Sequence, residues 1–453
     1  MAPLDLTGDE LRAALATATD YVADFVDRLP NAPVLDDHGL TELLDDPALR
    51  REPPEYGRPL DELLRLVDRA AAKGINSASP GALAYTPGGG LVSAAIADLV
   101  ANAINRYTGQ AAPAPALVAM ELDVLSWLRD LFSFPASTAG VLTTGGSMAT
   151  LSAVITARAA MLPANFLNGT LYVTSQTHHA TAKAAKLAGF PDQAVRMVPV
   201  DSELRMDPFA LQEAIQRDRE AGMVPFFVTA SAGTTNTGTI DPLPALADVA
   251  SVNGLWLHVD AAYGGFFHLT SRGRQRMDGI ERADSLALDP HKSMFLPFGT
   301  GCLLVREGSS LASAHYLADL RGASLPDFSD YGPELTREFR GLRMWLPLHL
   351  HGVGAFRAAL DEKLDLAEYV YKSLSSMPSL SVQQVPDLSV IVFKCRTAVE
   401  TKALLDRVNA SGRVALSSTR IHGELVARMC VLSFRTGKAR VDEALELIRE
   451  QVS

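Results

Sequence analysis

The middle of the chain alternates short apolar runs with stretches of helical spacing. Apolar runs rich in β-branched and aromatic residues predict strands at residues 171–174, 226–230, 255–259 and 301–305. Helical spacing predicts helices at residues 147–161, 181–187 and 242–252. Buried strands that alternate with helices indicate a mostly parallel sheet covered on both faces. Ligands of such sheets bind beyond the carboxyl ends of the strands.

The two ends of the chain have a different texture. Helical spacing predicts helices at residues 4–29, 91–100 and 117–131, and a long one after Pro333 with a break or kink at Pro347. Strand-like runs at residues 389–393 and 429–434 alternate with two helical runs. We therefore predict four parts: an N-terminal helical arm (1–80), a large α/β domain (81–335), connecting helices (336–377) and a small C-terminal α/β domain (378–453).

Composition excludes several classes of protein. A net charge of -11 argues against nucleic-acid binding, which needs clustered basic residues. Cys302, Cys395 and Cys430 form no C-x-x-C pair, which excludes a cysteine zinc site and favours a reducing compartment. The start, MAPLDLTGDELRAAL, does not resemble a signal peptide, and no apolar stretch is long enough to span a membrane. We expect a soluble cytoplasmic enzyme that acts on a small molecule.

Polar segments follow four of the apolar runs. In TTGGSMATL, residues 143–151, a Gly-Gly-Ser turn precedes a helix, whose first N–H groups and dipole form an anion site. Taken alone, this turn is more simply an N-capped helix with Ser147 as the cap. In YVTSQTHHATAKAA, His178 or His179 could reach a ligand and stack on an aromatic ring, although a histidine at a helix start is more often structural.

Two further segments carry a carboxylate and an amine. LWLHVDAAYGG places Asp260 at the end of a buried strand, where a carboxylate is costly unless it meets a cation or caps the next turn. SLALDPHKSMF places Lys292 after another strand. A lysine there is usually solvated, but the 32-residue spacing from Asp260 suits one strand–helix–strand step and puts both on neighbouring strands. Histidine spacing gives no metal site, and no G-x-S-x-G nucleophile elbow is present.

These segments, together with SAGTTNTGTIDPL and FRGLRMWLPL, resemble the group II pyridoxal-phosphate (PLP) decarboxylases, the family of aromatic-L-amino-acid and glutamate decarboxylases. The resemblance covers about residues 83–366 and is most specific in HVDAAY and DPHK. It implies the type I PLP-dependent, aspartate aminotransferase-like α/β fold. It also implies a homodimer with active sites at the subunit interface.

The resemblance also implies a role for each matched residue. Lys292 would hold PLP as a Schiff base, Asp260 would pair with the pyridine nitrogen, and His178 would stack on the ring. The remaining cofactor-binding positions, for the phosphate and the ring, are Gly146, Ser147, Thr235, Ala262, Asp289 and His291. Tyr316, in HYLADLRG, aligns across a gap with a loop tyrosine that protonates Cα. Relatives with phenylalanine there are oxidative aldehyde synthases, so Tyr316 favours simple decarboxylation.

Three segments depart from the family's pattern. Asp289 stands where animal aromatic decarboxylases and glutamate decarboxylases carry asparagine, and a carboxylate near a phosphate is repulsive unless it is paired or points away. In YTPGGG, Gly88 replaces a threonine that contacts substrate. The segment NRYTGQAAPAP, with Tyr107, lacks the bulky aromatic residues of its family counterpart. We assign Gly88, Tyr107 and His178 to substrate binding, in a pocket that is roomier or differently lined.

We therefore predict a PLP-dependent decarboxylase of an L-amino acid, with an aromatic substrate favoured over a short aliphatic or acidic one. An oxidative deaminase that gives an aldehyde and a desulfurase are the catalytic alternatives. A further alternative is a non-catalytic relative that binds partners or stores cofactor. Such a relative would be expected to have lost catalytic residues, but the lysine, aspartate and histidine of the site are all present.

Overall fold

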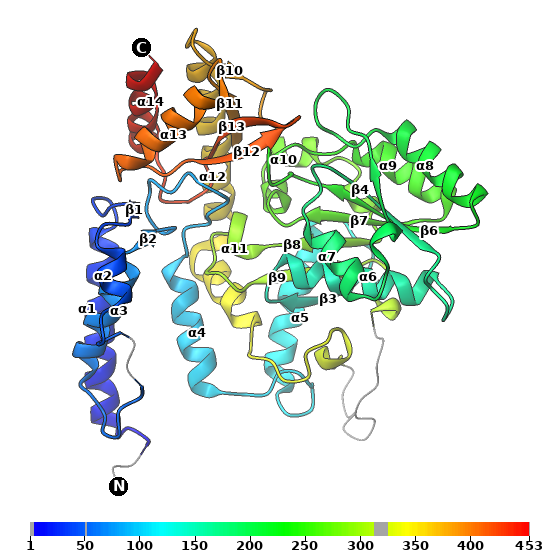
Figure 1. The fold of residues 1–453 in the computed structure, drawn as a ribbon. Coiled ribbons are helices and arrows are strands. Elements are labelled where there is room, and N and C mark those ends of the chain that lie inside the picture. The colour runs from blue at the N-terminus through cyan, green and yellow to red at the C-terminus, as the bar shows by residue number, and fades with distance from the viewer. Residues whose placement is uncertain (1–3, 50–51, 312–324, 453) are drawn as a thin grey trace.

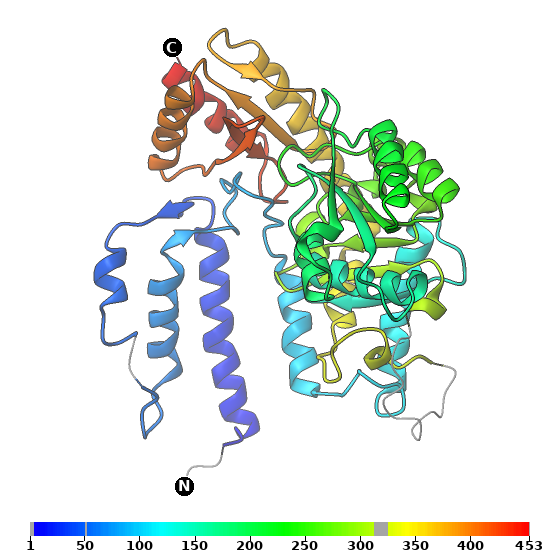
Figure 2. The same ribbon diagram turned by 45° about the vertical axis from the view of Figure 1, so that its right-hand side comes forward.

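The structure is a computed structural model that describes residues 4–49, 52–311 and 325–452. Its N-terminal helices stand at one side of the molecule, and a large sheet with its helices forms the main body (Figure 1). A smaller sheet with helices α13 (Ala398–Ala410) and α14 (Lys438–Val452) lies at one end of that body, and the turned view in Figure 2 shows the same separation. No helix within the described residues is long and apolar enough to cross a lipid bilayer.

The large sheet has seven strands in the described part of the chain. In spatial order they are β3 (Ala139–Thr143), β9 (Gly301–Val305), β8 (Ser285–Leu288), β7 (Trp256–Ala261), β6 (Val224–Ser231), β4 (Gly169–Thr174) and β5 (Val195–Val198). Only β9 runs antiparallel to its neighbours, so the prediction of a mostly parallel sheet is confirmed. The four strands predicted in this region correspond to β4, β6, β7 and β9 within two residues at either end.

Every residue of β4 and β8 is buried, which shows that both faces of the sheet are covered. The covering helices include α6 (Gly146–Met161), α7 (Ala180–Leu187), α8 (Pro208–Glu220) and α9 (Leu243–Asn253). The short helix α10 (Ser271–Arg276) follows β7 in the chain. α6 lies against β6 to β9 and packs on α7, while α8 and α9 contact β5 to β7. Leu286 of β8 is fully buried in this core, so Leu286→Ala would cost about 2–5 kcal/mol.

The carboxyl ends of β3, β4, β6, β7 and β8 meet at one edge of the sheet, because these strands run in the same direction. Asp260 of β7 is in register with Ala287 of β8, and Lys292 follows β8 after four residues. The prediction that Asp260 and Lys292 follow neighbouring strands is therefore confirmed.

The N-terminal part contains α1 (Gly8–Arg28), α2 (Leu40–Leu44) and α3 (Leu60–Ala71), with a short pairing of β1 (Leu35–Asp36) and β2 (Gly74–Ile75). Thr7 starts α1 with a capping box, because its hydroxyl accepts from Glu10 N–H while the Glu10 carboxylate accepts from Thr7 N–H. All 21 residues of α1 are described, and none of them is buried. The next helices are α4 (Val92–Ile104) and α5 (Pro115–Leu131).

The long helix predicted after Pro333 is α12 (Gly341–Ser375), but its interruption is not at Pro347. Pro347 lies inside the helix, and the non-helical residue is Gly352, with φ 73° and ψ 149°. Glycine adopts a positive φ without the steric cost that other residues meet, so the chain breaks its helical path there. The prediction of the break at Pro347 is wrong by five residues.

The small sheet is antiparallel, in the order β10 (Ser381–Val382), β11 (Val390–Lys394), β13 (Glu424–Cys430) and β12 (Ser417–Ile421), with α13 (Ala398–Ala410) and α14 (Lys438–Val452) beside it. The strand predicted at residues 429–434 is wrong in its position, since β13 ends at Cys430. Val431 and Leu432 are buried but lie outside the ladder, so these apolar residues indicated burial rather than strand pairing. The predicted boundaries between the four parts of the chain stay predictions.

Candidate active site

A cavity of about 320 Å³ lies at the edge of the sheet where the parallel strands end. It is lined by residues that follow β3, β4, β6, β7 and β8. All nine residues predicted to bind the cofactor line it: Gly146, Ser147, His178, Thr235, Asp260, Ala262, Asp289, His291 and Lys292. The fold thus brings together five segments that are up to about 150 residues apart in the sequence.

Lys292 presents its amine to this cavity from a short helix, α11 (Pro290–Ser293). Asp289 is the N-cap residue of α11, and its backbone carbonyl accepts from Lys292 N–H at 2.9 Å. The Lys292 side chain is 21% exposed, and its Nζ lies 3.0 Å from Oδ2 of Asp289. This amine is therefore accessible from the cavity and held beside a carboxylate.

Asp260 is the penultimate residue of β7 and also lines the cavity. Its Oδ1 accepts from Ala262 N–H at 3.1 Å, so it does cap the turn after the strand. That contact fixes the carboxylate group at the cavity wall, where it can also meet a cation. Ala262 is 7% exposed and offers a small, flat apolar surface beside it.

The Gly-Gly-Ser turn forms the start of α6. Gly145 is the N-cap residue, Gly146 begins the helix, and no side chain caps it, so the simpler interpretation with Ser147 as the cap is wrong. Ser147 is exposed, with its side chain free to turn to the cavity that it lines. The first turn of a 16-residue helix therefore presents its N–H groups and its positive dipole end to this space.

His178 follows β4 and faces the same cavity. Its Nδ1 accepts from Ala180 N–H at 3.3 Å, which places the hydrogen of the neutral ring on Nε2. Burial lowers the pKa of His178, and the attraction of Asp260 offsets this only in part. His178 is thus held as a neutral aromatic ring. His179, the other candidate, is exposed, and its ring lies tilted by 43° against that of His178, with centroids 4.2 Å apart.

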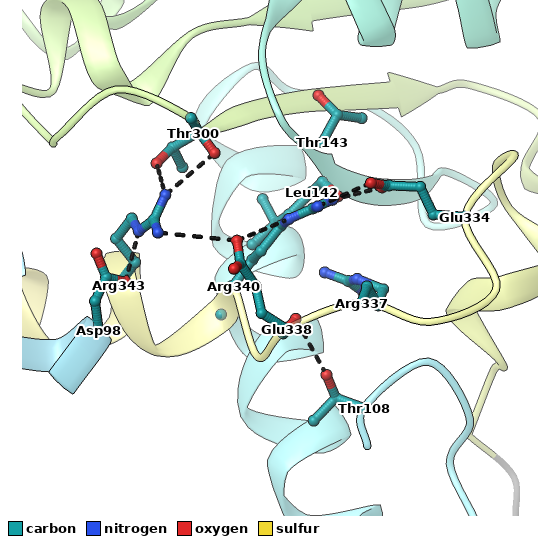
Figure 3. Close-up of polar contacts among 12 residues, drawn as sticks. Asp98, Thr108, Leu142, Thr143, Thr300, Glu334, Arg337, Glu338, Arg340 and Arg343 are labelled. Atoms are coloured by element: carbon teal, nitrogen blue, oxygen red, sulfur yellow. Dashed lines mark hydrogen bonds and ion pairs between the residues drawn. The ribbon is translucent and has the colours of Figure 1, made fainter. Parts of the chain in front are cut away.

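His291 is held by a contact that the sequence did not reveal. Its Nδ1 lies 2.6 Å from the carbonyl oxygen of Thr300, and Arg343 of α12 donates to the Thr300 hydroxyl at 3.1 Å (Figure 3). The sequence does not predict that Thr300 and Arg343 meet, because one lies in a turn and the other in a distant helix. The only indication that Arg343 matters was its place in FRGLRMWLPL, a segment that resembles the family.

Two described residues of the predicted site, Gly88 and Tyr107, do not line this cavity. Gly88 packs behind it, where a Cβ would lie 2.5 Å from the His291 carbonyl oxygen and 2.6 Å from that of Lys292. Close approach of two backbones therefore requires glycine there. Tyr107 is half-buried, and its hydroxyl donates to the Leu335 carbonyl at 2.8 Å. Tyr316 lies outside the described residues.

Together these groups suit a ligand with three features. The amine of Lys292 can attack a carbonyl carbon, the carboxylate of Asp260 can hold a protonated ring nitrogen, and the start of α6 can bind a phosphate. PLP carries all three groups, so the residues of the cavity fit it. Among the described residues no cluster of three or more histidine, cysteine, aspartate or glutamate side chains has the arrangement of a metal site.

Comparison with known proteins gives consistent matches over the whole chain. The family described as "Pyridoxal-dependent decarboxylase conserved domain" matches residues 46–396. The aromatic-L-amino-acid decarboxylase of Bacillus atrophaeus is 33% identical over 456 residues, which cover 96% of this chain and 93% of that protein. The phenylacetaldehyde synthase of Arabidopsis thaliana is 30% identical over 484 residues, with coverage of 100% and 97%.

Solved structures agree with the sequence matches. The crystal structure of Oryza sativa TDC with PLP and tryptamine superposes with a TM-score of 0.93 at 28% identity, and the match covers 100% of this chain and 99% of that one. A likeness of this extent includes the large sheet, the small sheet and the N-terminal helices.

Proposed function

We propose that this chain, which belongs to the pyridoxal-dependent decarboxylase family and uses PLP, removes the α-carboxylate of an aromatic L-amino acid and releases the amine and CO₂. The observation that carries the proposal is the convergence of Lys292, Asp260 and the start of α6 on one cavity. Decarboxylation of an amino acid is the chemistry of the family; the aromatic substrate, the amine product and the residue roles below are proposals.

Each of the chain's own residues has a defined task in this proposal. PLP, when bound, supplies an electron sink for the pair that the broken Cα–carboxylate bond leaves behind. Asp260 keeps the ring nitrogen protonated, Lys292 supplies the amine that holds the cofactor, and the start of α6 with Ser147 and His291 binds the phosphate. His178, neutral because burial lowers its pKa, stacks on the ring, with Ala262 on the other side and Thr235 near the ring oxygen.

An aromatic substrate is supported by the similar proteins. The Bacillus atrophaeus relative is named for aromatic amino acids, and the Oryza sativa structure contains tryptamine. Inside this chain, the predicted substrate residues give weaker support. Gly88 is explained by backbone packing, so it does not by itself indicate a roomier pocket.

The aldehyde product is the second candidate, because a relative of 30% identity is named a phenylacetaldehyde synthase. In our alignment, Tyr316 is the residue whose identity distinguishes amine-forming from aldehyde-forming relatives. A tyrosine there favours the amine, so we retain simple decarboxylation.

A homodimer is supported by apolar side chains that face solvent. On α4 these are Ile96 (51% exposed), Leu99 (54%), Val100 (42%) and Ile104 (43%), and α1 and α3 add further ones. α4 lies on the same side of the molecule as the N-terminal helices in Figure 1, and all of these helices carry exposed apolar side chains. A second copy would cover them. In that dimer we assign Tyr107, which does not line its own chain's cavity, to the partner's active site.

The proposed chemistry is tested by loading purified protein with PLP, reducing it with borohydride and mapping the modified peptide by mass spectrometry. We expect the label on Lys292, and no label and no amine from Lys292→Ala. Amine production by Lys292→Ala at the wild-type rate contradicts the assignment. A panel of aromatic, aliphatic and acidic amino acids, read out by CO₂, amine, ammonia and peroxide, tests the substrate and the product.

A further inference from the structure

Asp289 is a carboxylate buried inside the candidate site. It is 3% exposed, and its Oδ2 lies 3.0 Å from Nζ of Lys292 and 3.7 Å from Nε2 of His291. Its Oδ1 is buried and has no hydrogen-bond partner among the described residues. A buried carboxylate needs a compensating charge, and Lys292 supplies the nearest one.

The same carboxylate faces the start of α6. A Cβ added to Gly146 would lie 3.0 Å from Oδ2 of Asp289, and one added to Gly145 would lie 3.8 Å from Oδ1. The N–H groups and dipole of that helix end attract anions. Asp289 therefore places a negative charge at the one point of the cavity that is built to receive a phosphate.

We propose that Asp289 is the internal counter-ion of the free Lys292 amine and that its charge weakens binding of the cofactor's phosphate. The inference rests on the proposed function, which assigns the start of α6 to the phosphate and Lys292 to the cofactor. In the cofactor-free chain, the ammonium of Lys292 neutralises the carboxylate. Cofactor binding engages that amine and brings a second anion to the start of α6, so the carboxylate loses charge compensation and gains a repulsive neighbour.

Two features of the site agree with this assignment. His291 is the other cation-forming side chain near Asp289, but its Nε2 lies 3.7 Å from Oδ2, beyond hydrogen-bond distance, whereas Nζ of Lys292 lies at 3.0 Å. Lys292 is therefore the main partner that Asp289 can lose. An uncharged residue of similar shape, asparagine, would avoid the repulsion and could donate a hydrogen bond to a phosphate oxygen.

The first test measures cofactor affinity. Cofactor-free wild-type and Asp289→Asn proteins are titrated with PLP and with pyridoxal, which has the aldehyde and ring but no phosphate. We expect Asp289→Asn to bind PLP about tenfold or more tightly than wild type, equivalent to about 1.4 kcal/mol, with a smaller change for pyridoxal. Competition by inorganic phosphate should strengthen in the same variant. PLP binding by Asp289→Asn that equals or is weaker than wild type overturns the proposal.

The second test measures the Asp289–Lys292 pair in the cofactor-free protein by a double-mutant cycle of thermal unfolding. Lys292→Met leaves a buried carboxylate unpaired and should lower the Tm, and Asp289→Asn in the same chain should restore much of the loss. Additive effects of the two substitutions overturn the pairing. Asp289→Ser provides a second neutral variant if Asp289→Asn does not fold.

The outcomes separate this inference from the proposed function. If borohydride does not fix PLP to Lys292 in the wild-type protein, the proposed function fails. If that label is present but Asp289→Asn gains no affinity for PLP, only the role of Asp289 is overturned.

Discussion

Arg343 holds Thr300 at the back of the candidate site, with its Nη1 3.1 Å from the Thr300 hydroxyl and 3.1 Å from the Gly299 carbonyl (Figure 3). The Thr300 carbonyl in turn lies 2.6 Å from Nδ1 of His291. A carbonyl oxygen only accepts, so Nδ1 carries the hydrogen and Nε2 is left for the cavity side. Asp98 of α4, 2.6 Å from Nε of Arg343, fixes the guanidinium.

This arrangement predicts that Arg343 positions His291 for the phosphate. Arg343→Met frees the 299–300 turn, so His291 loses its fixed orientation. PLP affinity should fall about tenfold, the lower end of the effects seen when a residue that orients a ligand-binding side chain is removed. Arg343→Lys should recover part of the loss, because an ammonium can still donate to one oxygen. Fluorescence titration with PLP measures both variants.

A matched control is Arg282→Met, which removes an exposed arginine paired with Asp248 at 2.7 Å, outside the candidate site. Its PLP affinity should stay at the wild-type value. The idea fails if Arg343→Met binds PLP as tightly as that control, or if Arg343→Met loses pyridoxal affinity to the same extent as PLP affinity.

The sequence predicted the strand ends because burial leaves a strong local signal. Apolar runs predicted β6 and β7. The polar residues at their carboxyl ends, among them Asp260, then had to lie at one edge of the sheet. Lys292 was predicted at the same edge because it follows another apolar run and lies 32 residues after Asp260. Because adjacent parallel strands end at the same edge, the sequence predicted that Asp260 and Lys292 lie close together. The parallel pairing of β7 with β8 agrees with this.

Contacts that close the site from outside the sheet were not predictable in this way. Arg343 is 43 residues from Thr300, and an arginine in an amphipathic helix carries no sign of its partner. The pairing of Asp289 with Lys292 depends on the turn of a four-residue helix, which the sequence left open. Val431 and Leu432 pack in the core without joining the ladder, because burial and strand pairing are separate requirements.

Asp260→Asn tests the ring-nitrogen partner. Asparagine can still accept from Ala262 N–H through its amide oxygen, so the turn after β7 should persist and the Tm should change little. The negative charge is lost, and with it the stabilisation of the protonated ring nitrogen. We expect kcat to fall about 100-fold or more, the scale seen when one preorganised electrostatic partner is removed. Steady-state amine formation measures it, and a kcat within threefold of wild type would remove Asp260 from its role.

Tyr316→Phe tests the gapped alignment of the loop tyrosine. If Tyr316 protonates Cα, its loss should shift the product from amine toward aldehyde, with ammonia and peroxide formed at the expense of O₂. Mass spectrometry of amine and aldehyde, with a peroxidase assay, measures the split. Tyr331→Phe is the matched control, since Tyr331 is half-buried against Phe328 and outside the cavity lining. An unchanged amine yield from Tyr316→Phe shows that the alignment is wrong.

His258 makes the fold sensitive to acid. It is fully buried in β7, stacks on Phe227 and lies 2.8 Å from the Ser285 hydroxyl through Nδ1. Burial lowers the pKa of His258 to about 4, against an ordinary value of 6.5. Between these values the unfolded chain takes up a proton that the folded chain does not, so the free energy of unfolding falls as the pH decreases from about 6.5 to about 4. The full loss is about 3 kcal/mol.

His258→Gln should therefore lose less stability than wild type between pH 7 and pH 4.5, even if it is less stable at pH 7 because the stack on Phe227 is lost. His268, whose pKa burial also lowers to about 4, and Asp241, whose pKa burial raises to about 6 and which acts in the opposite direction, remain in both proteins. Their contributions cancel in the comparison. Urea unfolding at several pH values measures the difference, and parallel pH profiles for the two proteins would mean that His258 is not the group that takes up the proton on unfolding.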